Sequence, residues 1–177
     1  MHSPEAVEST SKTILIVDDL PANLEVVGRH LESHGYRAVV AQGGEEGIAR
    51  AELVNPDLIL LDVLMPGVDG FETCRRLKAR DGTRDIPVIF MTALSDTADK
   101  VTGFEAGAVD YVTKPLDGAE VLARIGTHLT LDSLRRQLQA QNAQLQQEIV
   151  APVLVSEDLQ EGLRAFAEKR PAVWSGR

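Results

Sequence analysis

From Thr13 onward, short apolar runs alternate with longer amphipathic segments, and this rhythm limits the folds open to the chain more than any other feature. Alternating strand-like and helix-like segments are typical of βα units built around a parallel sheet. The third and fourth runs are apolar throughout, as expected for central strands buried on both faces. Five such units by about residue 128 predict one doubly wound α/β domain. The runs are TILIVD (13–18), YRAVVA (36–41), DLILLD (57–62), IPVIFMT (86–92) and VDYVT (109–113).

Apolar residues between these runs recur with the period of a helix, so an amphipathic helix is predicted after each run. Helix starts are expected near Asp19, Ser95 and Asp117, where short polar side chains precede the apolar stripe. Gly35 and Gly107 stand where left-handed C-caps would end two of the helices. The residues expected on the apolar stripes are Leu24, Val27, Leu31, Ile48, Leu53, Phe71, Cys74, Leu77, Val101, Phe104 and Ala108.

Residues 129–150 contain six glutamines and neither glycine nor proline, which favours a continuous helix. Leucines recur there every seven residues, and a polar Asn occupies the other heptad row, a pattern of two-stranded parallel coiled coils. We therefore expect a homodimer seam in 129–150. The alternative is a surface helix folded back on the domain, because three heptads are marginal alone. The leucines are Leu131, Leu138 and Leu145, and the other row holds Arg135, Asn142 and Ile149.

The charge balance excludes some classes of partner. Lys and Arg number 18 against 27 Asp and Glu, a net charge of −9, whereas proteins that coat nucleic acid need a basic face. The single cysteine, Cys74, allows no internal disulfide or thiolate cluster, which fits a reducing compartment. The longest apolar stretch, 149–155, is too short to cross a bilayer, and the N-terminus lacks the apolar region of a signal peptide. We expect a soluble cytoplasmic protein that contacts neither nucleic acid nor membrane.

Polar side chains stand where the predicted strands end. Asp18 and Asp19 end the first strand, Asp62 the third and Thr92 the fourth, while Lys114 follows the fifth. Each alone also fits an ordinary role, such as a helix cap or a surface lysine. The carboxyl ends of parallel strands meet at one edge, however, and three clustered carboxylates need a cation, for which oxygen ligands favour Mg²⁺. A carboxylate beside Mg²⁺ and an ammonium can accept a phosphoryl group as an acyl phosphate.

Four strings around these residues carry a family resemblance: ILIVDD (14–19), LILLDVLMPGVDGFE (58–72), VIFMTAL (88–94) and GAVDYVTKP (107–115). In order, spacing and strand placement, residues 13–128 closely resemble the receiver domain of bacterial two-component response regulators. The resemblance implies a flavodoxin-like (βα)5 fold with a parallel five-stranded sheet in the order 2-1-3-4-5. It also implies Mg²⁺ as cofactor and a histidine kinase or phosphotransfer protein as partner. Such a domain catalyses only its own phosphorylation and dephosphorylation.

The resemblance further implies roles for individual residues. Asp62 would be the phosphoacceptor and Asp19 the principal Mg²⁺ ligand, while Asp18 would hold a metal-bound water. The other implied roles are the Leu64 backbone carbonyl as a metal ligand, Thr92 and Lys114 as ligands of the phosphoryl group, Tyr111 as the switch aromatic that moves with the threonine, and a cis Lys114–Pro115 bond.

Two positions that tune the lifetime of the acyl phosphate in similar domains hold Leu64 and Leu94. Neither side chain can orient an attacking water, so we expect a relatively long-lived acyl phosphate. A haloacid-dehalogenase-type phosphatase is a poor alternative, because its DxD motif after the first strand is replaced by DDL (18–20). His30 and His34 have a spacing that can bind a metal, but no third ligand is evident and a surface pair is the favoured interpretation.

We divide the chain into a flexible N-terminus (1–12), a receiver domain (13–128), a helical coiled-coil extension (129–150) and a partly helical C-terminal tail (151–177). The last 22 residues resemble the extreme C-terminus of enoyl-CoA hydratase (crotonase) family proteins, without any of that family's catalytic machinery. A fusion and a plain amphipathic helix both fit this tail. Its side chains of note are Leu159, Leu163, Phe166 and Trp174.

Only 27 residues follow the helical extension, too few for an output domain such as a diguanylate cyclase or a kinase. We therefore expect a stand-alone or truncated receiver that switches protein contacts around its fourth helix, fifth strand and fifth helix. The alternative is a constitutive dimerisation scaffold, or a fragment of a larger regulator whose output domain is missing. The downstream partner is unknown, and a true phosphatase would need turnover on exogenous substrates.

Overall fold

The computed structural model describes residues 11–93, 102–147, 157–171 and 173. By its internal contacts the chain divides into two compact units, Met1–Thr130 and Leu131–Arg177. In the described part of the chain, no helix combines the length and the apolar character that a membrane span requires. The elements are β1 (Thr13–Val17), α1 (Pro21–Glu32), β2 (Arg37–Ala41), α2 (Gly44–Val54), β3 (Leu58–Asp62), α3 (Gly70–Lys78), β4 (Val88–Thr92), β5 (Asp110–Thr113), α5 (Gly118–Leu145) and α7 (Glu157–Glu168).

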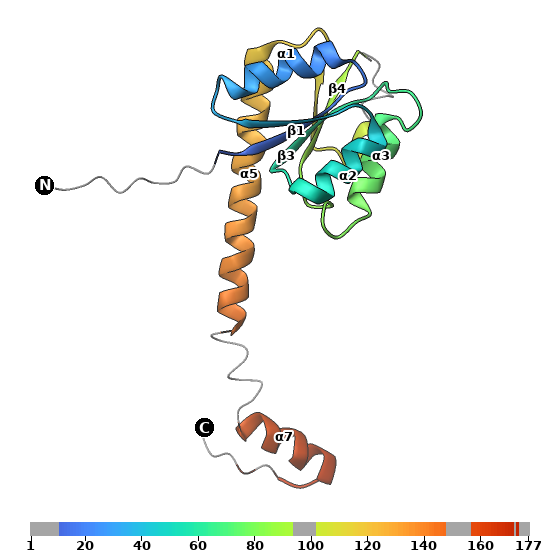
Figure 1. Cartoon of the computed structure of the whole chain (residues 1–177). Coiled ribbons are helices and arrows are strands. Elements are labelled where there is room, and N and C mark those ends of the chain that lie inside the picture. The colour runs from blue at the N-terminus through green and yellow to red at the C-terminus, as the bar shows by residue number, and fades with distance from the viewer. Residues whose placement is uncertain (1–10, 94–101, 148–156, 172, 174–177) are drawn as a thin grey trace, which may run out of the picture. The chain divides into compact units, whose positions relative to one another are not determined.

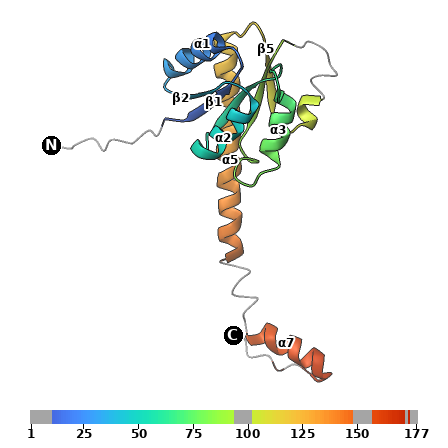
Figure 2. The same cartoon turned by 45° about the vertical axis from the view of Figure 1, so that its right-hand side comes forward.

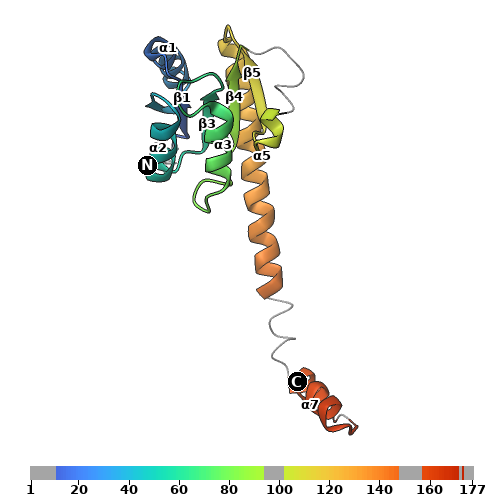
Figure 3. The same ribbon diagram turned by 90° about the vertical axis from the view of Figure 1, so that its right-hand side faces the viewer.

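The first unit is built on one parallel sheet of five strands in the order β2-β1-β3-β4-β5 (Figure 1). Figure 3 shows β1, β3, β4 and β5 following one another across this sheet. Every residue of β3 and β4 is buried, which confirms that these apolar runs are the central strands. The predicted fold class and strand order are therefore confirmed.

Helices cover both faces of the sheet, α1 and α5 on one and α2 and α3 on the other (Figures 1 and 2). Because side chains alternate along a strand, each strand contributes to two separate cores. In β1, Leu15 and Val17 pack with the residues of α2 and α3, whereas Ile14 and Ile16 pack with those of α1 and α5.

The predicted apolar stripe of α1 is confirmed, since Leu24, Val27 and Leu31 are buried. Leu53 of α2 does not face the core as predicted: it is 83% exposed, while Ile48 and Ala51 are buried. Five residues separate Ile48 from Leu53, which rotates Leu53 by roughly 140° around the helix from the buried stripe. Phe104 was also expected inward and is 51% exposed.

The helix ends follow the sequence signals in part. The Asp117 side chain accepts a hydrogen bond from the Glu120 backbone N–H at 3.0 Å, as expected for a cap at the start of α5. Gly35 and Gly107 have φ values of 84° and 97°, the left-handed conformation predicted for them. Asp19 does not cap α1, because the N-cap residue is Leu20 and no described side chain caps this end. Ser95 and Val101 lie outside the described residues.

Helix α5 continues into the predicted heptad segment as far as Leu145 (Figure 1). Its leucines past residue 130 are between 51% and 60% exposed, so this helix carries an apolar row on its surface. Helix α7 is held by Arg170, which bonds the Glu161 carboxylate, while Phe166 is 86% exposed. Ile149 and Trp174 lie outside the described residues. The exposed leucines of α5 are Leu131, Leu134, Leu138 and Leu145.

Candidate functional site

Four strand ends bring polar side chains to one edge of the sheet. Asp18 directly follows β1, and its backbone N–H bonds the Ala41 carbonyl of β2 at 3.2 Å. Asp62 and Thr92 are the last residues of β3 and β4. Lys114 follows β5, and its backbone N–H donates to the Thr92 carbonyl at 2.7 Å. Strand pairing thus continues to the edge and fixes where each of these side chains begins.

The Lys114 ammonium joins two of the carboxylates. Its Nζ lies 2.9 Å from Asp18 Oδ2 and 3.0 Å from Asp62 Oδ1. Asp18 is fully buried and Asp62 is 4% exposed, so bulk water has little access to either carboxylate. A charge without solvent needs a partner of opposite sign, which the ammonium supplies.

The electrostatics favour a further cation at this edge. Burial raises the pKa of Asp62 and the nearby Asp18 adds to this, while the bond from Lys114 and the Leu64 backbone N–H oppose it; the net direction is upward. Burial lowers the pKa of Lys114, but its bonds to Asp18 and Asp62 outweigh this and raise it. The ammonium therefore stays charged, yet it does not fully compensate the buried Asp62 carboxylate.

Carboxylate oxygens of Asp18, Asp19 and Asp62 all lie within 4.8 Å of one another. Three carboxylates and one ammonium leave a formal charge of −2. The side-chain atoms of this cluster that could bind a metal ion are all carboxylate oxygens. This donor set fits Mg²⁺, which binds through one or two carboxylates together with waters. The residues present therefore match the cofactor that the sequence predicts.

Asn23 belongs to this site and was not predicted from the sequence. Its Nδ2 lies 3.0 Å from both Oδ1 and Oδ2 of Asp18, and the Leu20 backbone N–H donates to Oδ1 at 2.9 Å. A polar residue in the first turn of a helix has no motif of its own. The available signal was its place five residues after Asp18, on a helix whose side chains tilt toward the strand end.

The loop between β3 and α3 holds Asp62 in place. Asp69 caps α3 by accepting from the Glu72 backbone N–H at 2.7 Å, and the Gly70 N–H donates to the Val63 carbonyl at 2.9 Å. A Cβ on Gly70 would lie 2.2 Å from the Asp62 carbonyl oxygen, so only glycine allows this approach. The loop therefore packs directly against the backbone of the predicted phosphoacceptor.

The structure places the remaining predicted residues as follows. Thr92 is 5% exposed at the end of β4, and the Lys114–Pro115 bond is cis, as predicted. Tyr111 is half-buried on β5, with its ring edge-on to Phe104 at 6.2 Å between centroids. The Leu64 side chain is 57% exposed beside the site, and its backbone N–H bonds Asp62. Leu94 lies outside the described residues, so the expected long lifetime stays a prediction.

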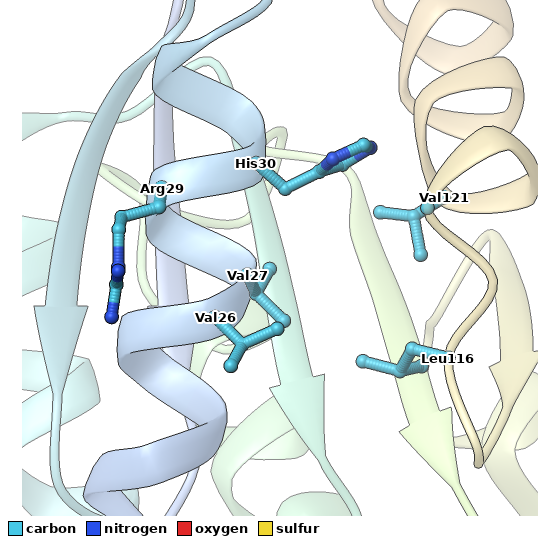
Figure 4. Close-up of a pocket in the computed structure, with 7 residues that line it drawn as sticks. Val26, Val27, Arg29, His30, Leu116 and Val121 are labelled. Atoms are coloured by element: carbon cyan, nitrogen blue, oxygen red, sulfur yellow. The ribbon is translucent and has the colours of Figure 1, made fainter.

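A separate pocket of about 570 Å³ lies between α1 and the start of α5 (Figure 4). Its walls contain none of the acidic residues of the site. His30 points into it, and within the described ranges its buried Nε2 has no hydrogen-bond partner. The rings of His30 and His34 are 4.7 Å apart, but in the described part of the chain only the Asp18, Asp19 and Asp62 cluster groups three metal-ligating side chains.

Comparison with known proteins places the chain among signalling domains. Residues 14–126 match the family model described as response regulator receiver domain. The chain is 49% identical over 112 residues to the DNA-binding dual master transcriptional regulator RpaA of Synechocystis, a match covering 63% of this chain and 46% of RpaA. It is 41% identical over 116 residues to the protein PilH of Pseudomonas aeruginosa, covering 66% of this chain and 96% of PilH.

Solved structures agree with this placement. The receiver domain of the sensor histidine kinase PA1611 from Pseudomonas aeruginosa matches with a TM-score of 0.64 and 32% identity, over 68% of this chain and 98% of that one. That structure has a magnesium ion coordinated in its active site cleft. The chemotaxis protein CheY4 of Vibrio cholerae matches with a TM-score of 0.64 and 26% identity, over 66% of this chain and 98% of that one.

Proposed function

This chain belongs to the response regulator receiver domain family, and on that premise we propose that Asp62 accepts a phosphoryl group from a histidine kinase or phosphotransfer protein in a Mg²⁺-dependent reaction. One observation carries the proposal: the Lys114 ammonium contacts Asp62 and Asp18 at 3.0 and 2.9 Å inside a cluster of three carboxylates. The chain spans less than half the length of the first curated relatives it matches, 46% of RpaA and 29% of the response regulator PleD of Caulobacter vibrioides.

The residues of the site divide the chemistry among them. A carboxylate oxygen of Asp62 forms a bond to phosphorus while the phosphorus–nitrogen bond of the donor's phosphohistidine breaks; the imidazole leaves with that electron pair and takes up a proton from water. Lys114 pairs with one phosphoryl oxygen and Thr92 hydrogen-bonds another. Asp19, Asp62 and the Leu64 backbone carbonyl would hold Mg²⁺, and Asp18 would hold a water bound to it; the ion supplies further positive charge to the transferring group.

Phosphorylation changes the surface beside β5 in this proposal. Thr92 reaches toward the new phosphoryl group, and the Tyr111 ring follows into the space that the threonine leaves. Tyr111 is well placed for this role because it is half-buried and its ring lies beside Phe104 and the Arg124 guanidinium, so a rotation would alter contacts at the β5 and α5 surface. A small local change of charge is thereby converted into a change of protein contacts.

Labelling with acetyl phosphate tests the proposal on the full chain. We expect one phosphoryl group per chain, labelling that requires Mg²⁺, and its loss in Asp62→Asn. The matched control is Asp81→Asn, because the Asp81 side chain is 92% exposed and lies outside the site. Labelling that persists in Asp62→Asn would overturn the assignment. Repeated turnover of acetyl phosphate, beyond the rate of loss of the label, would favour a phosphatase instead.

We propose in addition that residues 129–150 form a homodimer seam. The exposed leucines of α5 support it, because a surface row of leucines at heptad spacing is covered in coiled coils by a second helix. The resemblance of residues 156–177 to the end of enoyl-CoA hydratase family proteins brings no activity into the proposal.

A further inference from the structure

Within the described part of the chain, Asp18 accepts more hydrogen bonds than the other carboxylates of the site. It is fully buried, and among the described residues three groups donate to it: the Leu20 backbone N–H, the Asn23 amide and the Lys114 ammonium. Asn23 is the only one of the three that contacts both oxygens, each at 3.0 Å from its Nδ2. A donor that contacts both oxygens opposes rotation of the carboxylate about its Cβ–Cγ bond. A donor that contacts only one oxygen opposes this rotation less.

The position of Asn23 in α1 explains how it reaches Asp18. Helix α1 begins at Pro21, directly after the loop that carries Asp18 and Asp19. Side chains of a helix tilt toward its N-terminus, so a short side chain in the first turn points back at the preceding strand end. Pro21 sets the helical backbone angle at the first position of this turn, where its missing N–H costs no bond.

The amide also suits the charge of the site. Three carboxylates and one ammonium leave a formal charge of −2, which matches a divalent cation. A lysine or arginine at position 23 would reduce that charge and repel the metal, and an aspartate would add a fourth carboxylate beside a fully buried one. A neutral carboxamide supplies N–H donors to Asp18 without changing the charge of the cluster.

We propose that Asn23 is a positioning residue for the Mg²⁺ site, acting through Asp18. It holds the Asp18 carboxylate at the orientation in which the cluster accepts the cation. Because the amide is neutral, it leaves the negative charge of the cluster available to the metal. This role rests on the proposed function, since it assumes the metal site, but Mg²⁺ binding can be measured with no phosphodonor present.

The experiment compares the full-length protein with Asn23→Ala and Asn23→Leu. Alanine removes the amide and favours the helix more than asparagine does, while leucine keeps a similar volume without donors. Glu25→Ala is the matched control, because Glu25 lies on the same helix and pairs with Arg29, outside the site. Mg²⁺ affinity is measured by calorimetric titration, thermal unfolding without metal monitors the fold, and the labelling rate with acetyl phosphate is followed across Mg²⁺ concentrations.

We expect both Asn23 variants to weaken Mg²⁺ binding about tenfold, the lower end of the effect of removing a group that orients a metal ligand. At saturating Mg²⁺ their labelling rates should return to within about twofold of wild type, because Asn23 acts on the Asp18 carboxylate of the metal site and not on the phosphoryl group. If Asn23 had only a structural role, its variants would lose thermal stability and would show no labelling defect that added Mg²⁺ corrects. Unchanged Mg²⁺ affinity in a folded variant would overturn the inference, as would a labelling defect that saturating Mg²⁺ leaves in place. If wild type binds Mg²⁺ but is not labelled, the proposed function fails and the titration still decides the role of Asn23.

Discussion

The ammonium of Lys114 lies within 3.0 Å of two carboxylates that are almost fully buried. Removing one partner of a buried ion pair costs about 3–5 kcal/mol, because charge is left without compensation. The lysine side chain keeps 22% exposure, so we expect Lys114→Met to lower the free energy of unfolding without metal by about 3 kcal/mol. Urea unfolding of the full chain measures this difference.

Mg²⁺ gives this prediction a second readout. Removal of the ammonium leaves the cluster more negative, so added Mg²⁺ should stabilise Lys114→Met more than it stabilises wild type. Lys12→Met is the control, because the Lys12 ion pair with Asp57 lies at the surface with 56% of the lysine side chain exposed and is worth at most about 1 kcal/mol. Similar losses in the two variants would contradict the importance we give to the buried pair.

At the scale of single residues, the sequence predicts groups that stand at strand ends and misses those that reach the site from elsewhere. Asp18, Asp62 and Lys114 could be placed because strand periodicity and parallel topology fix where a strand ends. Asn23 could not, because its role depends on the direction in which α1 leaves the sheet. Asp19 was open to two interpretations, and the absence of any described side-chain cap on α1 favours the cluster over the cap.

The Asp110 carboxylate of β5 contacts two side chains of α5, those of Arg124 and His128. Arg124 Nη1 lies 2.8 Å from both Asp110 oxygens, and His128 Nε2 lies 3.0 Å from Oδ2. Burial raises the pKa of Asp110, but the bonds from His128 and Arg124 outweigh it and lower the pKa below its ordinary value. A carboxyl with a lowered folded-state pKa stabilises the protein above its unfolded pKa, near 4, and loses this contribution as the pH falls through the folded value.

We therefore expect Asp110→Asn to lower the free energy of unfolding by about 1–2 kcal/mol at neutral pH, the usual worth of hydrogen bonds to a charged group at a partly exposed site. The difference from wild type should shrink as the pH is lowered below about 4, where the wild-type carboxyl becomes protonated. Denaturant unfolding at a series of pH values provides the measurement, with Asp81→Asn as the exposed control. A difference that stays constant from pH 7 downward would show that the ionised form of Asp110 is not what stabilises this contact.

At the scale of elements, strands were easier to predict than helix faces. Each of the five apolar runs contains an observed strand, and the predicted ends differ from the observed ones by at most two residues. Whether a helical residue faces the core depends on its angle around the helix axis. The spacing of five residues between Ile48 and Leu53 was enough to place Leu53 on the wrong face. The continuity of α5 into the heptads was predictable because neither glycine nor proline interrupts residues 129–150.

At the scale of the whole molecule, one helix belongs to both compact units. Helix α5 contributes Val121 and Ile125 to the core on one face of the sheet, and beyond residue 130 it carries the exposed leucine row. The heptad spacing predicts the leucine row, but sequence alone could not decide between a seam and a helix folded back on the domain. These leucines are exposed on α5, and the oligomeric state of the protein distinguishes the seam from the folded-back helix.

A change at Leu138 tests the seam at this scale. Leu138 is 60% exposed at the middle of the row, and burying a leucine side chain in a dimer is worth about 2 kcal/mol for each chain. A lysine there would lose this burial on both chains and place two like charges against each other. We expect the wild-type full chain to be dimeric and Leu138→Lys monomeric at the same concentration. Ala140→Lys is the matched control, since residue 140 lies two positions further along, away from the leucine row.

Sedimentation velocity with and without beryllofluoride and Mg²⁺ distinguishes a dimer that depends on phosphorylation from a constitutive one. A dimer that tightens with beryllofluoride in wild type, and does not in Asp62→Asn, links the seam to phosphorylation of the receiver. A dimer indifferent to beryllofluoride favours the constitutive scaffold, because the seam would then be independent of the phosphoacceptor. A monomeric wild type, or a dimer that Leu138→Lys and Ala140→Lys weaken equally, would exclude the leucine row as the interface. Since α5 is continuous from Gly118 to Leu145, coupling requires only that phosphorylation alter the packing of its first turns on the sheet.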